Sequence, residues 1–152
     1  EEPFTVNRLG VLMKERYFFT GNGYSYMNAS VAVKYGEVLV GKSEWVLIDR
    51  GVLLNSRNKN VQEQEAMIKP PYREPEVLPM ATGTILWYLN SPNNERSFGD
   101  KPWTYTCCKE KIGEHRVVLG GFTNYGLVVS HYDDCDYDED DYGIGTMVKF
   151  DS

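Results

Sequence analysis

Residues 115–131 read HRVVLGGFTNYGLVVSH, two apolar runs with glycines between them. Each run carries valine and leucine and has a histidine at its outer end. Runs of β-branched residues are typical of strands, and glycine supplies the positive backbone angles that tight turns need. The stretch therefore predicts an antiparallel hairpin, with strands near 114–119 and 124–131 and a turn at 120–123.

The same pattern of short apolar runs, separated by glycine, asparagine and proline, continues through the chain. It predicts further strands near 11–19, 25–34, 37–41, 44–54, 82–89, 103–108 and 145–150. About nine strands in two groups suit a sandwich or a closed barrel, because both arrangements protect the strand edges. We expect an all-β fold, an antiparallel β-sandwich or closed barrel, forming a single β domain over residues 1–152.

One short helix is predicted over residues 60–69. Asn60 can cap its first turn, and Glu63 stands three residues later, as in a capping box. Pro70 and Pro71 would end it. Four prolines between positions 70 and 79 exclude a central strand there and favour an extended connection.

Charge is distributed unevenly along the chain. The net charge is −6, but residues 133–141, DDCDYDEDD, hold seven of the 22 acidic residues and no base. The other 15 acidic residues face 16 basic ones, so the remainder is nearly neutral and offers no basic stripe for nucleic acid. No apolar run approaches the roughly 20 residues of a membrane-spanning helix. We expect neither a nucleic-acid partner nor a membrane span.

The acidic segment is a candidate cation site. In an extended segment, alternate side chains point to one side, and carboxylate oxygens are the ligands that Ca²⁺ prefers. The segment lacks the turn glycine and the final glutamate of an EF-hand. We expect weak Ca²⁺ binding or none, and no other cofactor, with these ligands: Asp134, Asp136, Asp138 and Asp140.

Three cysteines are too few for a disulfide scaffold and have no zinc-site spacing. If one bridge forms, it is expected to join Cys108 to Cys135, which lie near the same end of the predicted meander. Alternation along the strand places Cys107 on the face of Trp103 and Tyr105. We expect Cys107 to be buried and Cys108 to be accessible.

The sequence contains no G-x-S-x-G motif, no glycine-rich phosphate-binding loop and no HExxH zinc motif. His115 and His131 fall on neighbouring predicted strands and could meet a cysteine, but both also fit the end of an apolar strand face. Glu44, Asp49 and Glu114 could pair across a cleft as in glycosidases, and a pocket lined by two carboxylates would favour that hypothesis. Enzymatic activity stays open, with a non-catalytic role favoured.

Tyrosines near predicted loops are candidates for ligand or partner contact, because the ring gives a large contact area with few rotatable bonds. They are Tyr24, Tyr26, Tyr132, Tyr137 and Tyr142. We expect a non-catalytic module, extracellular or surface-displayed, that recognises a protein, glycan or small ligand through tyrosine-rich and acidic loops. Two alternatives remain: a structural subunit of an extracellular or viral assembly, forming a homo-oligomer through open strands, and a hydrolase using cross-strand carboxylates.

Overall fold

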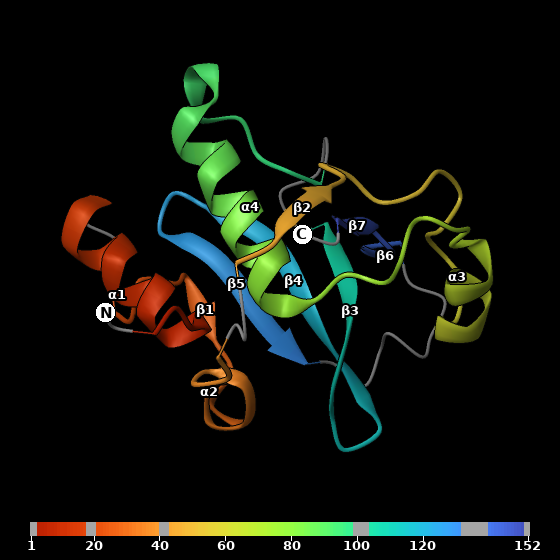
Figure 1. Cartoon of the computed structure of the whole chain (residues 1–152), viewed down its shortest axis with the longest axis horizontal. Coiled ribbons are helices and arrows are strands. Elements are labelled where there is room, and N and C mark those ends of the chain that lie inside the picture. The colour runs from red at the N-terminus through yellow and green to blue at the C-terminus, as the bar shows by residue number, and fades with distance from the viewer. Residues whose placement is uncertain (1–2, 18–20, 40–42, 99–103, 132–139, 151–152) are drawn as a thin grey trace.

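The computed structural model describes residues 3–17, 21–39, 43–98, 104–131 and 140–150. It shows a mixed α/β fold in which helices pack on an open sheet (Figure 1). The expected all-β sandwich or closed barrel is therefore wrong. The predicted strand 82–89 and residues 11–17 of the predicted strand 11–19 fall within long helices. The main sheet of the described residues contains parallel pairs and does not close.

The main sheet has five strands in the order β1-β5-β4-β3-β6. Its antiparallel centre comprises β3 (Tyr105–Ile112), β4 (His115–Thr123) and β5 (Gly126–His131), and the parallel edges are β1 (Tyr26–Met27) and β6 (Tyr142–Gly143). A second, antiparallel sheet pairs β2 (Trp45–Ile48) with β7 (Met147–Phe150). The smaller sheet joins two segments that lie about 100 residues apart along the chain, and it builds one wall of the pocket described below.

The predicted hairpin at 115–131 is confirmed as β4 and β5, but its turn is not at 120–123. Strand β4 continues through Gly120 and Gly121, and the turn lies at 124–125. A Cβ at position 120 would overlap the carbonyl oxygen of Thr104. This glycine therefore permits a close approach of neighbouring chains, accompanied by a shift in register, where we expected a turn.

The helices that the strand prediction missed follow a helical spacing of buried residues. In α4 (Val77–Asn90) the buried side chains are Val77, Met80, Ala81, Thr84 and Ile85, which fall three or four residues apart. In α1 (Val6–Tyr17) they are Val6, Leu9 and Met13. The predicted strand at 25–34 is also wrong, because β1 ends after two residues and α2 (Ala29–Tyr35) follows, capped by the Asn28 side chain.

The predicted short helix is confirmed as α3 (Val61–Met67). Its capping box is complete, because Asn60 Oδ1 accepts from the Glu63 amide and Glu63 Oε2 accepts from the Asn60 amide, each at 3.0 Å. The proline-containing connection after it is shorter than expected. Helix α4 already begins at Val77, and Pro79 is accommodated in its first turn, where a missing amide costs little.

Both faces of the main sheet are covered. Helices α1, α2 and α4 pack on one face (Figure 1). The other face carries a smaller core with Tyr105, Val118 and Tyr142. Cys107 points into the smaller core and Cys108 into the larger, and both are fully buried. The expectation of a buried Cys107 is confirmed, whereas the expectation of an accessible Cys108 is wrong because its face lies under the helices.

In the part of the chain that is described, no helix combines the length and the apolar character needed to cross a membrane.

A short 3-10 helix, η1 (Pro92–Asn94), follows α4.

Candidate functional site: an apolar pocket with an ion-pair cluster at one end

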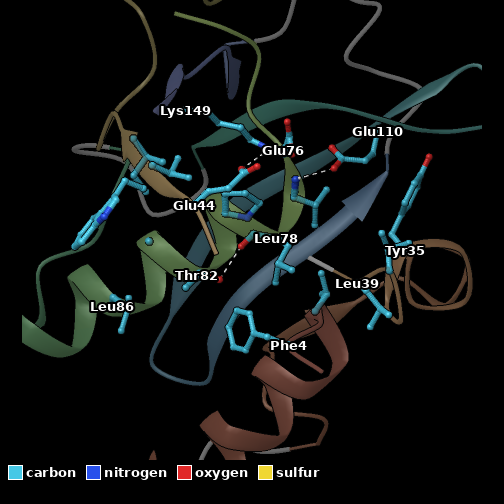
Figure 2. A pocket seen from close by; sticks show the side chains of 18 residues that line it. Phe4, Tyr35, Leu39, Glu44, Glu76, Leu78, Thr82, Leu86, Glu110 and Lys149 are labelled. Atoms are coloured by element: carbon cyan, nitrogen blue, oxygen red, sulfur yellow. Dashed lines mark hydrogen bonds and ion pairs between the residues drawn. The ribbon is translucent and has the colours of Figure 1, made fainter. Parts of the chain in front are cut away.

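A pocket of about 500 Å³ opens between the first half of α4, strand β2 and the segments that precede α1 and follow α2. Figure 2 shows that Glu44, Glu76, Glu110 and Lys149 gather on one side of it, with Phe4 and Leu39 on the opposite side. The side chains that form most of its apolar wall are Phe4, Leu39, Trp45, Ile48, Leu78 and Leu86. The pocket thus has an apolar body and a charged end.

Helix α4 supplies one wall through a regular spacing of residues. Leu78, Thr82 and Leu86 are four residues apart, so they lie along the same side of the helix and all line the pocket. The Thr82 hydroxyl donates to the Leu78 carbonyl at 2.7 Å, so its hydrogen-bonding demand is met within the helix. This wall is therefore apolar over two helical turns.

The second wall comes from the pairing of β2 with β7. Val46 pairs with Lys149, so the lysine side chain lies on the same face as Val46 and Ile48. That face borders the pocket. The register of the small sheet is thus what brings a lysine from the end of the chain beside an otherwise apolar wall.

The rim of the pocket leaves large apolar side chains in contact with water. Trp45 is 82% exposed and Leu39 is 60% exposed, and Val38 and Leu86 are also exposed. Single exposed apolar residues are common, but a contiguous group bordering a concavity is typical of an interaction site.

A chain of ion pairs forms the charged end. Lys149 Nζ lies 2.8 Å from Glu76 Oε2 and 3.2 Å from Glu44 Oε2, and Lys109 Nζ lies 2.7 Å from Glu76 Oε1. Burial alone would raise the pKa of Glu76, but the hydrogen bonds from Lys109 and Lys149 outweigh it and lower that pKa. Both oxygens of Glu76 are therefore engaged, and the group is an ionised structural link.

Glu110 differs from its neighbours, because no lysine pairs with it among the described residues. Its Oε1 accepts a hydrogen bond from the Val77 amide at 3.1 Å, at the first turn of α4. Its Oε2 is buried and has no hydrogen-bond partner in the described structure. Burial raises the pKa of Glu110, against the lowering effect of hydrogen bonds from the Val77 amide and from its own backbone amide, and of the charge on Lys109. The pocket is therefore lined by one carboxylate with a buried oxygen, Oε2, that has no hydrogen-bond partner among the described residues.

The tyrosines singled out from the sequence are dispersed. Tyr24 is buried and its hydroxyl donates to the Val6 carbonyl at 2.7 Å, and Tyr142 is buried with its ring stacked on Tyr105. Tyr26 is half exposed on the edge strand β1. None of these three lines the pocket. The other two, Tyr132 and Tyr137, lie outside the described residues.

Most of the expected cation site also lies outside the described residues, namely Asp134, Asp136 and Asp138. Asp140 is described, and its side chain accepts a hydrogen bond from Asn58 at 2.9 Å. In the described ranges no three His, Cys, Asp or Glu side chains lie close enough together to hold a metal ion. Cys135 lies outside these ranges, and with it the predicted bridge to Cys108.

The histidines meet each other at one end of the sheet. The rings of His115 and His131 stack with centroids 6.4 Å apart, on the face that carries Val117 and Val129. Strand β3 pairs Ile112 with His115, four residues along the strand from Cys108. The histidines therefore extend the end of an apolar strand face, one of the two arrangements that the sequence allows.

Of the three carboxylates proposed as a catalytic group, only Glu44 lines the pocket. Asp49 accepts a hydrogen bond from the Thr146 hydroxyl, and Glu114 is exposed in the β3–β4 turn. The pocket instead brings in Glu76 and Glu110, which the sequence did not single out. Glu110 sits in the run Lys-Glu-Lys of 109–111, which resembles a solvent-exposed strand end, so no local signal marks it.

Comparison with known proteins identified no relative: the sequence matches no protein-family model, no curated protein and no solved structure.

Proposed function

We propose that the protein is a non-catalytic binding protein whose pocket takes an amphipathic small molecule. The main support for this proposal is that the cavity is apolar along most of its wall and has the ion-pair cluster of Glu44, Glu76, Lys109 and Lys149 at one end. A volume of about 500 Å³ lies within the range of small-molecule sites, which are mostly apolar with a few polar groups that orient the ligand.

The exposed rim supports an apolar ligand body. Trp45, Leu39 and Leu86 leave apolar surface in water, and a ligand chain lying over them would remove that surface from solvent. Burial of an apolar side chain of this size contributes about 1.5–3 kcal/mol. A few such contacts suffice for micromolar affinity.

The ion-pair cluster supports a fixed ligand orientation. Glu76, Lys149 and Lys109 hold one another in place through the contacts described above, so the polar end is ordered before a ligand enters. A preorganised site loses less conformational entropy on binding. We infer that the ligand places its polar head at this cluster and its apolar body along α4 and β2.

Binding of the neutral dye N-phenyl-1-naphthylamine tests this function. Its fluorescence should rise in a saturable, one-site manner. Leu39→Asp should weaken binding about tenfold, because it puts a charge where apolar contact is lost. Leu54→Asp is the matched control, since Leu54 is 86% exposed and lies outside this pocket, and it should bind as the wild type does.

Two results would overturn the proposal. One is the absence of saturable dye binding, and the other is an equal loss in Leu39→Asp and Leu54→Asp. Light scattering at the same protein concentration should show a monomer. A stable dimer that Leu39→Asp dissociates would identify a second copy of the chain as the occupant of the rim, as the assembly alternative requires.

A hydrolase is the second candidate, favoured by the three carboxylates that line the pocket. The pKa of Glu110 is raised and that of Glu76 is lowered, a divergence found in acid–base pairs. Against this role, both oxygens of Glu76 are bonded to lysines, so it is a weak base. Cleavage of p-nitrophenyl glycosides by the wild type but not by Glu110→Gln would support the hydrolase.

A further inference from the structure

We propose that the ligand of this pocket carries a protonated amine, and that its ammonium group is held by the carboxylates at the charged end, with Glu110 as its direct partner. This inference rests on the proposed function, because it concerns the head of the same amphipathic ligand. It distinguishes an alkylammonium from an alcohol or a carboxylate of equal chain length.

The balance of charge at this end favours a cation. Three carboxylates, those of Glu44, Glu76 and Glu110, face two ammonium groups, those of Lys109 and Lys149. Glu74, which also faces Glu110, has its own cation in Arg116. Each lysine is already within hydrogen-bond distance of a glutamate. One negative charge therefore lacks a counterpart, and a single ligand cation supplies it.

Glu110 is the carboxylate of these three that pairs with neither lysine. The Val77 amide satisfies Oε1, whereas Oε2 has no partner in the described part of the chain. A buried carboxylate oxygen without a donor is costly, and a donor that arrives with a ligand removes that cost. The last torsion of a glutamate side chain is soft, so a small rotation of the carboxylate can turn Oε2 toward the pocket that Glu110 lines.

The other ligand classes fit less well. An anionic head would meet three carboxylates, and it would have to compete with Glu76 and Glu44 for Lys149. An alcohol could donate a hydrogen bond to the Glu110 carboxylate but would bring no positive charge, so the negative charge of Glu110 would stay uncompensated in a partly buried place. An ammonium group combines the donor with the charge.

The protonation of Glu110 should make the affinity for an ammonium ligand depend on pH. Burial raises the pKa of Glu110, so at a given acidic pH a larger fraction of it is protonated in the empty pocket than of a solvent-exposed glutamate. The groups that act on it are the Val77 amide, its own backbone amide and Lys109, which lower its pKa, and Glu76, which raises it. Glu74 also faces Glu110, because the charge of Glu110 raises the pKa of Glu74. An ammonium ligand needs the ionised form. Its affinity should therefore increase from about pH 5 to pH 8, where the amine is still charged.

The test uses displacement of N-phenyl-1-naphthylamine by decylamine, decanol and decanoate, each below its micelle-forming concentration. At pH 7.5 decylamine should bind at least tenfold more tightly than decanol, and decanoate more weakly than both. Glu110→Gln keeps an oxygen for the Val77 amide but replaces the free carboxylate oxygen by an amide group. In this variant the preference for decylamine over decanol should fall to about twofold, and its pH dependence should disappear.

The control is Glu114→Gln, which removes one carboxylate from the exposed turn between β3 and β4 and should keep the full preference. Equal binding of decylamine and decanol to the wild type would overturn the inference and leave the proposed function standing. Failure of all three compounds to displace the dye would overturn the inference and the account of the binding site together. If Glu110→Gln weakens decanol as much as decylamine, Glu110 shapes the pocket and does not hold the head group, which also overturns the inference.

Discussion

Ile48 of β2 lies directly against Gly83 of α4, so closely that a Cβ at position 83 would overlap the end of the Ile48 side chain. Both residues line the pocket. The glycine costs α4 about 1 kcal/mol of helix propensity relative to alanine. In return, β2 can approach the helix and close one side of the pocket, so the contact sets the width of the binding site.

Gly83→Ala should therefore weaken dye binding several-fold while changing stability little. The gain in helix propensity offsets part of the clash, and Ile48 has to turn toward the pocket to relieve the rest. Dye titration and urea unfolding of the same samples measure both effects. Gly51→Ala is the control, because a Cβ there meets nothing within 4 Å. Unchanged dye affinity in Gly83→Ala would show that this contact does not shape the site.

Loss of the capping box should destabilise the protein. Asn60→Ala removes the acceptor for the Glu63 amide and should lower the free energy of unfolding by about 1 kcal/mol. Gln62→Ala, at an exposed position of the same helix, should change it by less than about 0.5 kcal/mol. Urea unfolding gives both values. Equal values for the two variants would mean that the cap contributes nothing to the stability of the fold.

The parts of the fold that could be predicted from the sequence are those with local signals. The hairpin of β4 and β5 follows from its apolar runs, and α3 follows from Asn60, Glu63 and the prolines after it. Helix α4 was missed although its buried residues have helical spacing. Its core, ATGTILWYL, contains threonine, isoleucine and aromatic residues, which favour strands, and a glycine, which disfavours a helix. Packing on the sheet overrides that preference.

The pocket could not be predicted, because it depends on distant pairings. Lys149 reaches Glu76 only because β7 pairs with β2 beside α4, across a separation of 73 residues. Glu110 reaches the Val77 amide only because β3 passes the start of α4. Neither pairing has a local signature in the sequence. The features with local signatures are the loop tyrosines and the acidic segment, and the sequence predicts the site at these features instead.

Arg116 should be important for stability. Its side chain is buried on β4, lies 2.7 Å from Glu74 Oε1, pairs with Glu65 and donates to the Cys108 carbonyl at 3.0 Å. Replacing this buried arginine removes its packing and its hydrogen bond, and leaves two glutamates, which are 40% and 32% exposed, without their cation. Arg116→Ala should lower the free energy of unfolding by about 3 kcal/mol.

The control for this variant is Arg16→Ala on the exposed side of α1, which should change the free energy of unfolding by less than about 0.5 kcal/mol. Chemical denaturation compares the two variants. A loss at Arg116 no larger than that at Arg16 would contradict a structural role for the buried pairs.

The pH dependence of stability should identify Glu110. Its pKa in the folded protein is raised above the ordinary value of 4.5, so folding favours the protonated carboxyl group. The contribution of this group to the free energy of unfolding is therefore complete below about pH 4.5 and is lost as the pH rises through the folded-state pKa. Glu110→Gln does not titrate. Its free energy of unfolding, relative to the wild type, should therefore increase between pH 4 and pH 8. Glu114→Gln should show no such trend, and a constant or falling difference for Glu110→Gln would contradict the burial of this carboxylate.

An amphipathic ligand in the pocket between α4 and β2, with its head at Glu110, should be visible in an NMR titration with decylamine at pH 7.5. The Val77 amide donates to Glu110 Oε1 and therefore reports on that carboxylate. We predict saturable shifts at the amides of Val77, Leu78, Thr82 and Ile48, with the largest at Val77. Shifts confined to residues outside the pocket, or no saturable shifts at all, would show that the ligand does not bind in this pocket.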